Sequence, residues 1–169
     1  MPRRLPKNLP HLKSAVDFKA TNGVSNCCFH RAAAFVLDVP GSVLCMGTLR
    51  AADEQERLEI ANASPVPFIH AWCEFDGLVY APTTIERMGN RLVPFHRDAY
   101  YTMNGISDVR TLTRKELLTL SGKVGLSAHL KHFRPLHDGA KISVLLDAAG
   151  IKWEISENGG IIPATVKEY

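Results

Sequence analysis

The sequence lacks the features that would assign it to a membrane, secreted or repetitive class. No apolar run approaches the roughly 20 residues that a membrane-spanning helix needs. The basic N-terminal stretch MPRRLPKNLP contains three prolines, where a secretory signal would carry an apolar core. No internal repeat or low-complexity segment is present. These absences predict a cytoplasmic protein without a membrane partner.

A strong charge of one sign is also missing. The 20 Lys and Arg residues exceed the 17 Asp and Glu residues by only three, and they are spread along the chain. A nucleic-acid-binding surface usually needs a concentrated basic patch. Nucleic acid is therefore not the expected partner, although a basic arm over residues 1–21 keeps salt-sensitive binding to DNA or RNA as a third hypothesis.

Cysteine is scarce, with four residues. Cys27 and Cys28 are neighbours, whereas Cys45 and Cys73 lie in apolar runs, so the spacing is not that of a disulfide-stapled secreted domain. Adjacent residues at a helix start diverge by about 100°, which argues against a chelating pair. No metal or other cofactor is expected, and the cysteines are assigned to packing or catalysis.

The patterning predicts one compact domain. Hydrophobic residues make up 46% of the chain, enough for a core of its own. We expect an extended basic arm over 1–21 and a single domain over 22–169. The expected helices cover 27–37, 53–60, 114–121 and 138–150; the expected strands cover 42–50, 68–75, 78–83, 91–95 and 99–103, with a closing hairpin over 151–164. This order defines an α+β domain with a mainly antiparallel sheet.

The first expected helix carries a cysteine at its amino end. With Asn26 as the N-cap, Cys28 falls in the first turn and shares an apolar face with Ala32 and Phe35. The face that includes Arg31 is more polar. A thiol in the first turn lies beside unpaired backbone N–H groups and the positive end of the helix dipole, which favour the nucleophilic thiolate. An ordinary buried cysteine is the alternative.

A histidine lies near the start of the expected strand 68–75. His70, Trp72 and Glu74 alternate along this strand and therefore share one face, and the Asp-Gly pair that follows predicts a hairpin turn. A lone histidine in a strand is more often a core residue than a base. Together with Cys28 on a facing helix, however, His70 would supply the base that a thiol nucleophile needs.

The segments CFHRAAAF and HAWCEFDGLVYAPT resemble the bacterial transglutaminase-like cysteine proteinases. This papain-like group includes small phage and bacterial proteins and the leader peptidases of lasso-peptide biosynthesis. The resemblance covers residues 22–84 and implies a papain-like core, with an N-terminal nucleophile helix packed on a mainly antiparallel sheet. It implies that Cys28 is the nucleophile and His70 the general base. Asn22 and Asn26 compete as the amide donor to the oxyanion.

The family pattern ends in an aspartate within D-P-T, but Ala81 stands at that position here. The aspartate would orient the histidine and stabilise its imidazolium form. A carboxylate or amide from elsewhere could replace it, and the candidates are Asp76, Asp98, Asn104 and Asp108. Otherwise the site works as a Cys-His dyad, or the chain has lost catalysis and uses its cleft for binding. An alanine introduced to trap a complex would give the same sequence.

The expected activity is that of a cysteine-dependent hydrolase, a peptidase, amidase or deamidase that cleaves an amide bond of a peptide or protein. With an amine as acceptor, the same first half-reaction leads to transglutamination. Trp72 would wall the cleft, with Glu74 behind it. The alternative is a catalytically impaired papain-like domain that binds a protein partner or small ligand in that cleft. The sequence leaves the oligomeric state open.

Overall fold

A computed structural model describes residues 27–59, 64–80, 94–124, 139–157 and 160–164, so the arm over 1–21 lies outside the described residues. The elements in chain order are α2 (Cys27–Asp38), β1 (Val43–Leu49), α3 (Glu56–Glu59), β2 (Phe68–Phe75), β3 (Leu78–Tyr80), β4 (Phe95–His96), α4 (Arg97–Asn104), β5 (Ser107–Thr113), α5 (Arg114–Val124), α7 (Gly139–Ala148), β6 (Trp153–Ile155) and β7 (Ile161–Pro163). Helices and a mainly antiparallel sheet together make an α+β fold, as predicted. None of these helices is long and apolar enough to cross a membrane.

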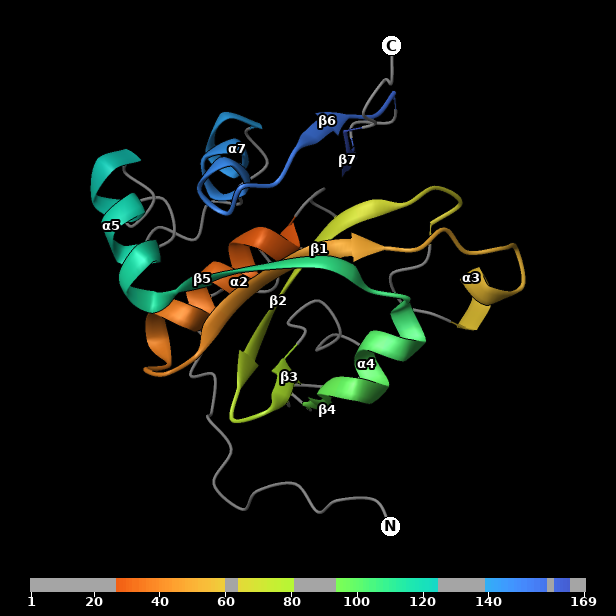
Figure 1. Cartoon of the computed structure of the whole chain (residues 1–169), viewed down its shortest axis with the longest axis horizontal. Helices are drawn as coiled ribbons and strands as arrows, with labels where there is room; N and C mark the ends of the chain where they lie inside the picture. Colours follow the sequence, from red (N-terminus) through yellow and green to blue (C-terminus); the bar gives the residue numbers. More distant parts are fainter. Residues whose placement is uncertain (1–26, 60–63, 81–93, 125–138, 158–159, 165–169) are drawn as a thin grey trace.

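The central element is a five-stranded antiparallel sheet in the order β4-β3-β2-β1-β5. Apolar side chains of α2, α5, α7 and β7 form one core cluster with one face of the sheet. Helix α4 contributes to a second, smaller cluster on the other face. Figure 1 shows the separation, with α4 on the opposite side of the strands from α7 and the β6–β7 hairpin. The sheet is therefore covered on both faces.

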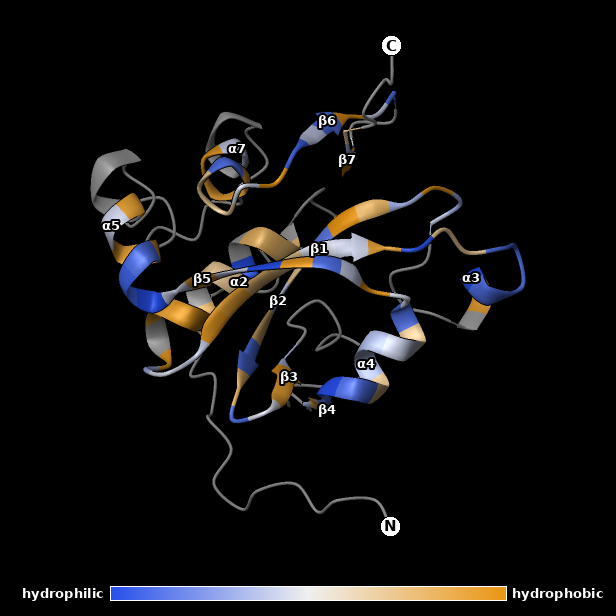
Figure 2. Cartoon of the chain, in the orientation of Figure 1, coloured by the Kyte–Doolittle hydropathy of each residue, from blue (hydrophilic) through white to orange (hydrophobic). Residues whose placement is uncertain are grey.

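Helix α2 is buried on more sides than its pattern predicts. Ala32 and Phe35 are fully buried, as expected for the inward face. Phe29 and Ala33 are also fully buried, and Arg31, which we placed on a more polar face, is only 2% exposed. The reason is that the core cluster of α2 also contains residues of α5 and α7. Figure 2 shows the resulting concentration of apolar residues in α2, β1 and β2.

The turn between β2 and β3 forms where it was predicted. Asp76 and Gly77 both have positive φ angles, 52° and 75°. This left-handed backbone suits a tight hairpin whose strands keep their right-handed twist, and Asp and Gly are the residues that tolerate it. The hairpin pairs Cys73 with Tyr80. It therefore fixes which side chains of the two strands share a face.

One prediction for the middle of the chain is wrong, and one strand there was not predicted. Residues 99–103, expected as a strand, belong to α4. Gly105 ends this helix in the left-handed conformation with φ 55°, and its N–H donates to Thr102 O. Strand β5, which was not predicted, follows and pairs with β1. Burial of Tyr100 and Asn104 on one face of α4 outweighs the β propensity of its residues.

Candidate functional site

Cys28 occupies the first turn of α2, where the sequence placed it. Its side chain is 9% exposed and belongs to the core cluster between α2 and the sheet, and its thiol is not in a disulfide. The same cluster contains Ile69, Ala71 and Cys73 of β2. Cys28 therefore faces the side of β2 that carries these three residues.

His70 lies on the other side of β2. Its ring centroid is 6.1 Å from that of Phe68 and 6.2 Å from that of Trp72, and both neighbours belong to the cluster beneath α4. His70 is 3% exposed, and its Nε2 atom has no hydrogen-bond partner among the residues that the structure describes. Burial lowers the pKa of His70 to about 4, because desolvation disfavours the charged ring. The imidazole is therefore neutral at pH 7.

The expected nucleophile–base pair is not formed, because the two side chains lie on opposite faces of the sheet. Alternate residues of a strand point to opposite faces, so Ala71 faces α2 while His70 and Trp72 face α4. Rotating His70 toward Cys28 would require a one-residue slip of β2. Such a slip would exchange every side chain of the strand between the two clusters.

Trp72 and Glu74 lie on the same face of β2 as His70, as predicted. Their contacts with residues of α4 hold this helix against the sheet. Glu74 Oε1 accepts hydrogen bonds from Trp72 Nε1 at 3.3 Å and from the Tyr101 hydroxyl, and Oε2 lies 3.2 Å from Arg97 Nε. The Arg97 guanidinium also lies 4.7 Å from the centroid of the Tyr101 ring. Arg97 and Tyr101 were not predicted as residues of this site. Their spacing of four residues on a helix was the available signal.

Cys73 and Cys45 are buried and contribute to the packing of the core. Cys73 Sγ donates a hydrogen bond to Ala32 O at 3.2 Å, which ties β2 to α2. Burial raises the pKa of Cys73 well above its usual value. Burial also raises the pKa of Cys45, and the negative charge of Glu74 adds to that rise. Both thiols are thus held in the protonated, weakly nucleophilic form.

The candidates for an orienting group do not meet His70. Asp76 occupies the hairpin turn, and Asp98 and Asp108 are exposed. Asn104 is buried but donates its side-chain N–H to Tyr100 O at 2.9 Å. Among the described residues, no hydrogen bond joins any of these four candidates to His70. The other predicted positions, Asn22, Asn26 and Ala81, lie outside the described residues.

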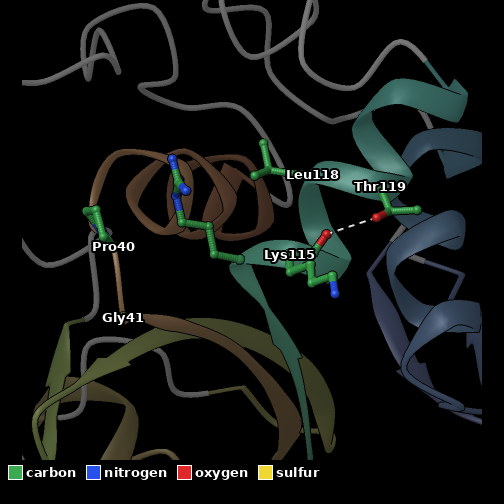
Figure 3. A pocket seen from close by; sticks show the side chains of 6 residues that line it. Pro40, Gly41, Lys115, Leu118 and Thr119 are labelled. Atoms are coloured by element: carbon green, nitrogen blue, oxygen red, sulfur yellow. Dashed lines mark hydrogen bonds between the residues drawn. The ribbon is translucent and has the colours of Figure 1, made fainter.

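Two pockets are lined by described residues, and neither includes Cys28 or His70. The first, of about 550 Å³, is an open groove between the end of α2 and the start of α5. Figure 3 shows Pro40 and Gly41 on one side of it and Lys115, Leu118 and Thr119 on the other. The second, of about 310 Å³, lies between the sheet and the β6–β7 hairpin.

No family model, curated protein or solved structure matches this chain. Within the part of the chain that the structure describes, no group of three or more His, Cys, Asp and Glu side chains is placed to hold a metal ion. The function is therefore inferred from the geometry of the residues.

Proposed function

We propose that this chain is a catalytically impaired papain-like domain that binds a protein partner or small ligand. The observation that carries the proposal is the position of His70 on the α4 side of β2, while Cys28 packs on the α2 side. A general base has to lie within hydrogen-bond reach of the thiol from which it takes a proton, at roughly 3 Å or through one water molecule.

The electrostatics support the same conclusion. A thiolate at neutral pH is commonly stabilised by a neighbouring imidazolium. Burial keeps the pKa of His70 near 4, so this ring carries no positive charge at pH 7. Ala81 stands at the position of the family's aspartate and has no carboxylate that would raise the pKa of His70. Loss of the aspartate and loss of the thiol–imidazole contact are consistent with one another.

The rate of Cys28 alkylation tests the proposal. In a Cys27→Ser background, iodoacetamide at pH 7 is expected to modify Cys28 more slowly than free cysteine, because a side chain that is 9% exposed must wait for local opening. Replacing His70 with Phe should not slow the reaction further. Peptide mapping locates the label, and the buried Cys45 and Cys73 provide internal controls for global unfolding.

A thiol hydrolase acting on a peptide or protein amide bond is the second candidate. It is favoured by the position of Cys28 in the first turn of α2, where the helix dipole stabilises a thiolate. This candidate predicts the opposite result: alkylation of Cys28 faster than that of free cysteine at pH 6 to 7, and a marked loss of that rate in the His70→Phe variant. Such a result would support the hydrolase and contradict the proposal that the chain is catalytically impaired.

A further inference from the structure

The smaller pocket is lined by residues that lie far apart in the sequence. We call it the hairpin pocket, and its lining residues are Gly47, Thr48, Ile69, Asp108, Arg110, Gly150, Ile151, Lys152, Pro163 and Ala164. The sheet supplies the first five through β1, β2 and β5. The connection from α7 to β6 and the end of β7 supply the others. Its volume of about 310 Å³ is at the small end of the range for ligand sites, roughly 300 to 1,000 Å³.

Local backbone structure fixes two walls of the hairpin pocket. On one side, Gly150 ends α7 with φ 73°, and the Ile151 N–H donates to Leu146 O at 3.0 Å. On the other, Asp108 has φ 53° beside a shift in the pairing register of β1 and β5. A non-glycine residue in the left-handed region is strained, and such residues concentrate at binding and active sites. A pocket with fixed walls loses little entropy when a ligand binds.

The hairpin pocket carries charges of both signs. Arg110 and Lys152 contribute two cations, and Asp108 contributes a carboxylate. The ion pairs among the described residues are Arg50–Glu56 and Arg97–Glu74, so none of the three charges of the pocket is in an ion pair there. Ile69, Ile151, Pro163 and Ala164 add an apolar surface.

We propose that the hairpin pocket binds a zwitterionic α-amino acid with an aliphatic side chain. Its carboxylate would lie between Arg110 and Lys152, its ammonium group at Asp108, and its side chain against Ile69 and Ile151. This inference rests on the proposed binding function and names a ligand class for it. The mixture of charges favours a zwitterion over a phosphate ester, because the Asp108 carboxylate repels a dianion. The volume of about 310 Å³ is large enough for a molecule of amino-acid size.

Titration with L-leucine, followed by calorimetry and by amide correlation spectra, tests the inference on the full chain. Leucine should bind and shift the amide signals of Ile151, Lys152 and Arg110. N-acetyl-L-leucine lacks the ammonium group and L-leucinamide lacks the carboxylate, so each should bind at least about tenfold more weakly, as expected for the loss of one charge-assisted contact.

Matched variants test which residue contacts each charged end of the ligand. Arg110→Gln should weaken leucine at least about fivefold while leaving leucinamide unchanged, and Asp108→Asn should weaken leucine while leaving N-acetyl-leucine unchanged. Asn tolerates the left-handed backbone at this position, so the second variant keeps the fold. Lys115→Gln, in the groove beside α5, is the control and should change nothing.

Absence of leucine binding, or equal binding of leucine and its two blocked derivatives, would overturn the inference. Equal effects of Lys115→Gln and Arg110→Gln would also overturn it, because binding would then follow net charge alone. None of these three results bears on the rate of Cys28 alkylation, so failure of the amino-acid site is distinguishable from failure of the proposed binding function.

Discussion

Replacing His70 with Phe should remove a specific loss of stability in acid. Burial lowers the pKa of His70 from 6.5 to about 4 in the folded protein, so the unfolded chain binds this proton more tightly. Stability is then complete above about pH 6.5 and falls as the pH decreases, until the folded state is also protonated near pH 4. At about 1.4 kcal/mol per pH unit, the loss is about 2 kcal/mol at pH 5 and about 3 kcal/mol below pH 4.

The Phe substitution keeps an aromatic ring between Phe68 and Trp72 and eliminates the buried Nε2 atom, for which the described part of the chain supplies no hydrogen-bond partner. We therefore expect the variant to be more stable than the parent by about 1 kcal/mol at pH 7, with the difference growing to about 3 kcal/mol at pH 5. Urea unfolding at several pH values measures both the stability difference at pH 7 and its increase toward pH 5. His70→Gln, which is smaller, should show the same change in pH dependence even if it packs less well.

Other acidic groups also titrate in this range, so the test is the difference between parent and variant. His96→Phe, at a half-buried position just before α4, shows whether removing any imidazole has the same effect. If the stability curves of the parent and both His70 variants remain parallel between pH 4 and 7, the reasoning from the burial of His70 is refuted.

Two further substitutions test the face of the sheet beneath α4. Tyr101→Phe removes the hydroxyl that donates to Glu74 and leaves both rings in place, so we expect a loss of about 1 to 2 kcal/mol in urea unfolding; a change below about 0.5 kcal/mol would show that the bond contributes little. Gly47→Ala would place a methyl group 2.9 Å from Trp72 Cη2 and 3.1 Å from Ser107 O, and the overpacking should cost about 1 to 3 kcal/mol in the same assay. An Ala variant as stable as the parent would contradict the close packing of β1, β2 and β5 at this glycine.

The elements with clear local signals were predictable from the sequence. Strand β2, the Asp76–Gly77 turn and the common face of His70 and Trp72 follow from alternation and turn chemistry, and the structure has them. The inward position of Cys28 follows from helical periodicity and is also found. Each of these features depends on residues close together in the chain.

The relation between Cys28 and His70 was not predictable by the same means. Both faces of β2 are apolar, with Ile69 and Ala71 on one and Phe68 and Trp72 on the other. Nothing in the strand therefore indicates which face the helix covers. That choice is made by the packing of α2 and α4 on opposite sides of the sheet, which depends on residues far apart in the sequence.

The enclosure of α2 affects how the chain acquires its structure during synthesis. The apolar cluster around this helix includes Leu117 of α5 and Leu145 and Leu146 of α7, which leave the ribosome long after the helix itself. Until they arrive, Phe29 and Ala33 lack part of the covering that makes them fully buried in the finished protein. The nascent N-terminal half should therefore be a chaperone client, and shortening the chain before α7 should yield an aggregating product rather than a smaller stable one.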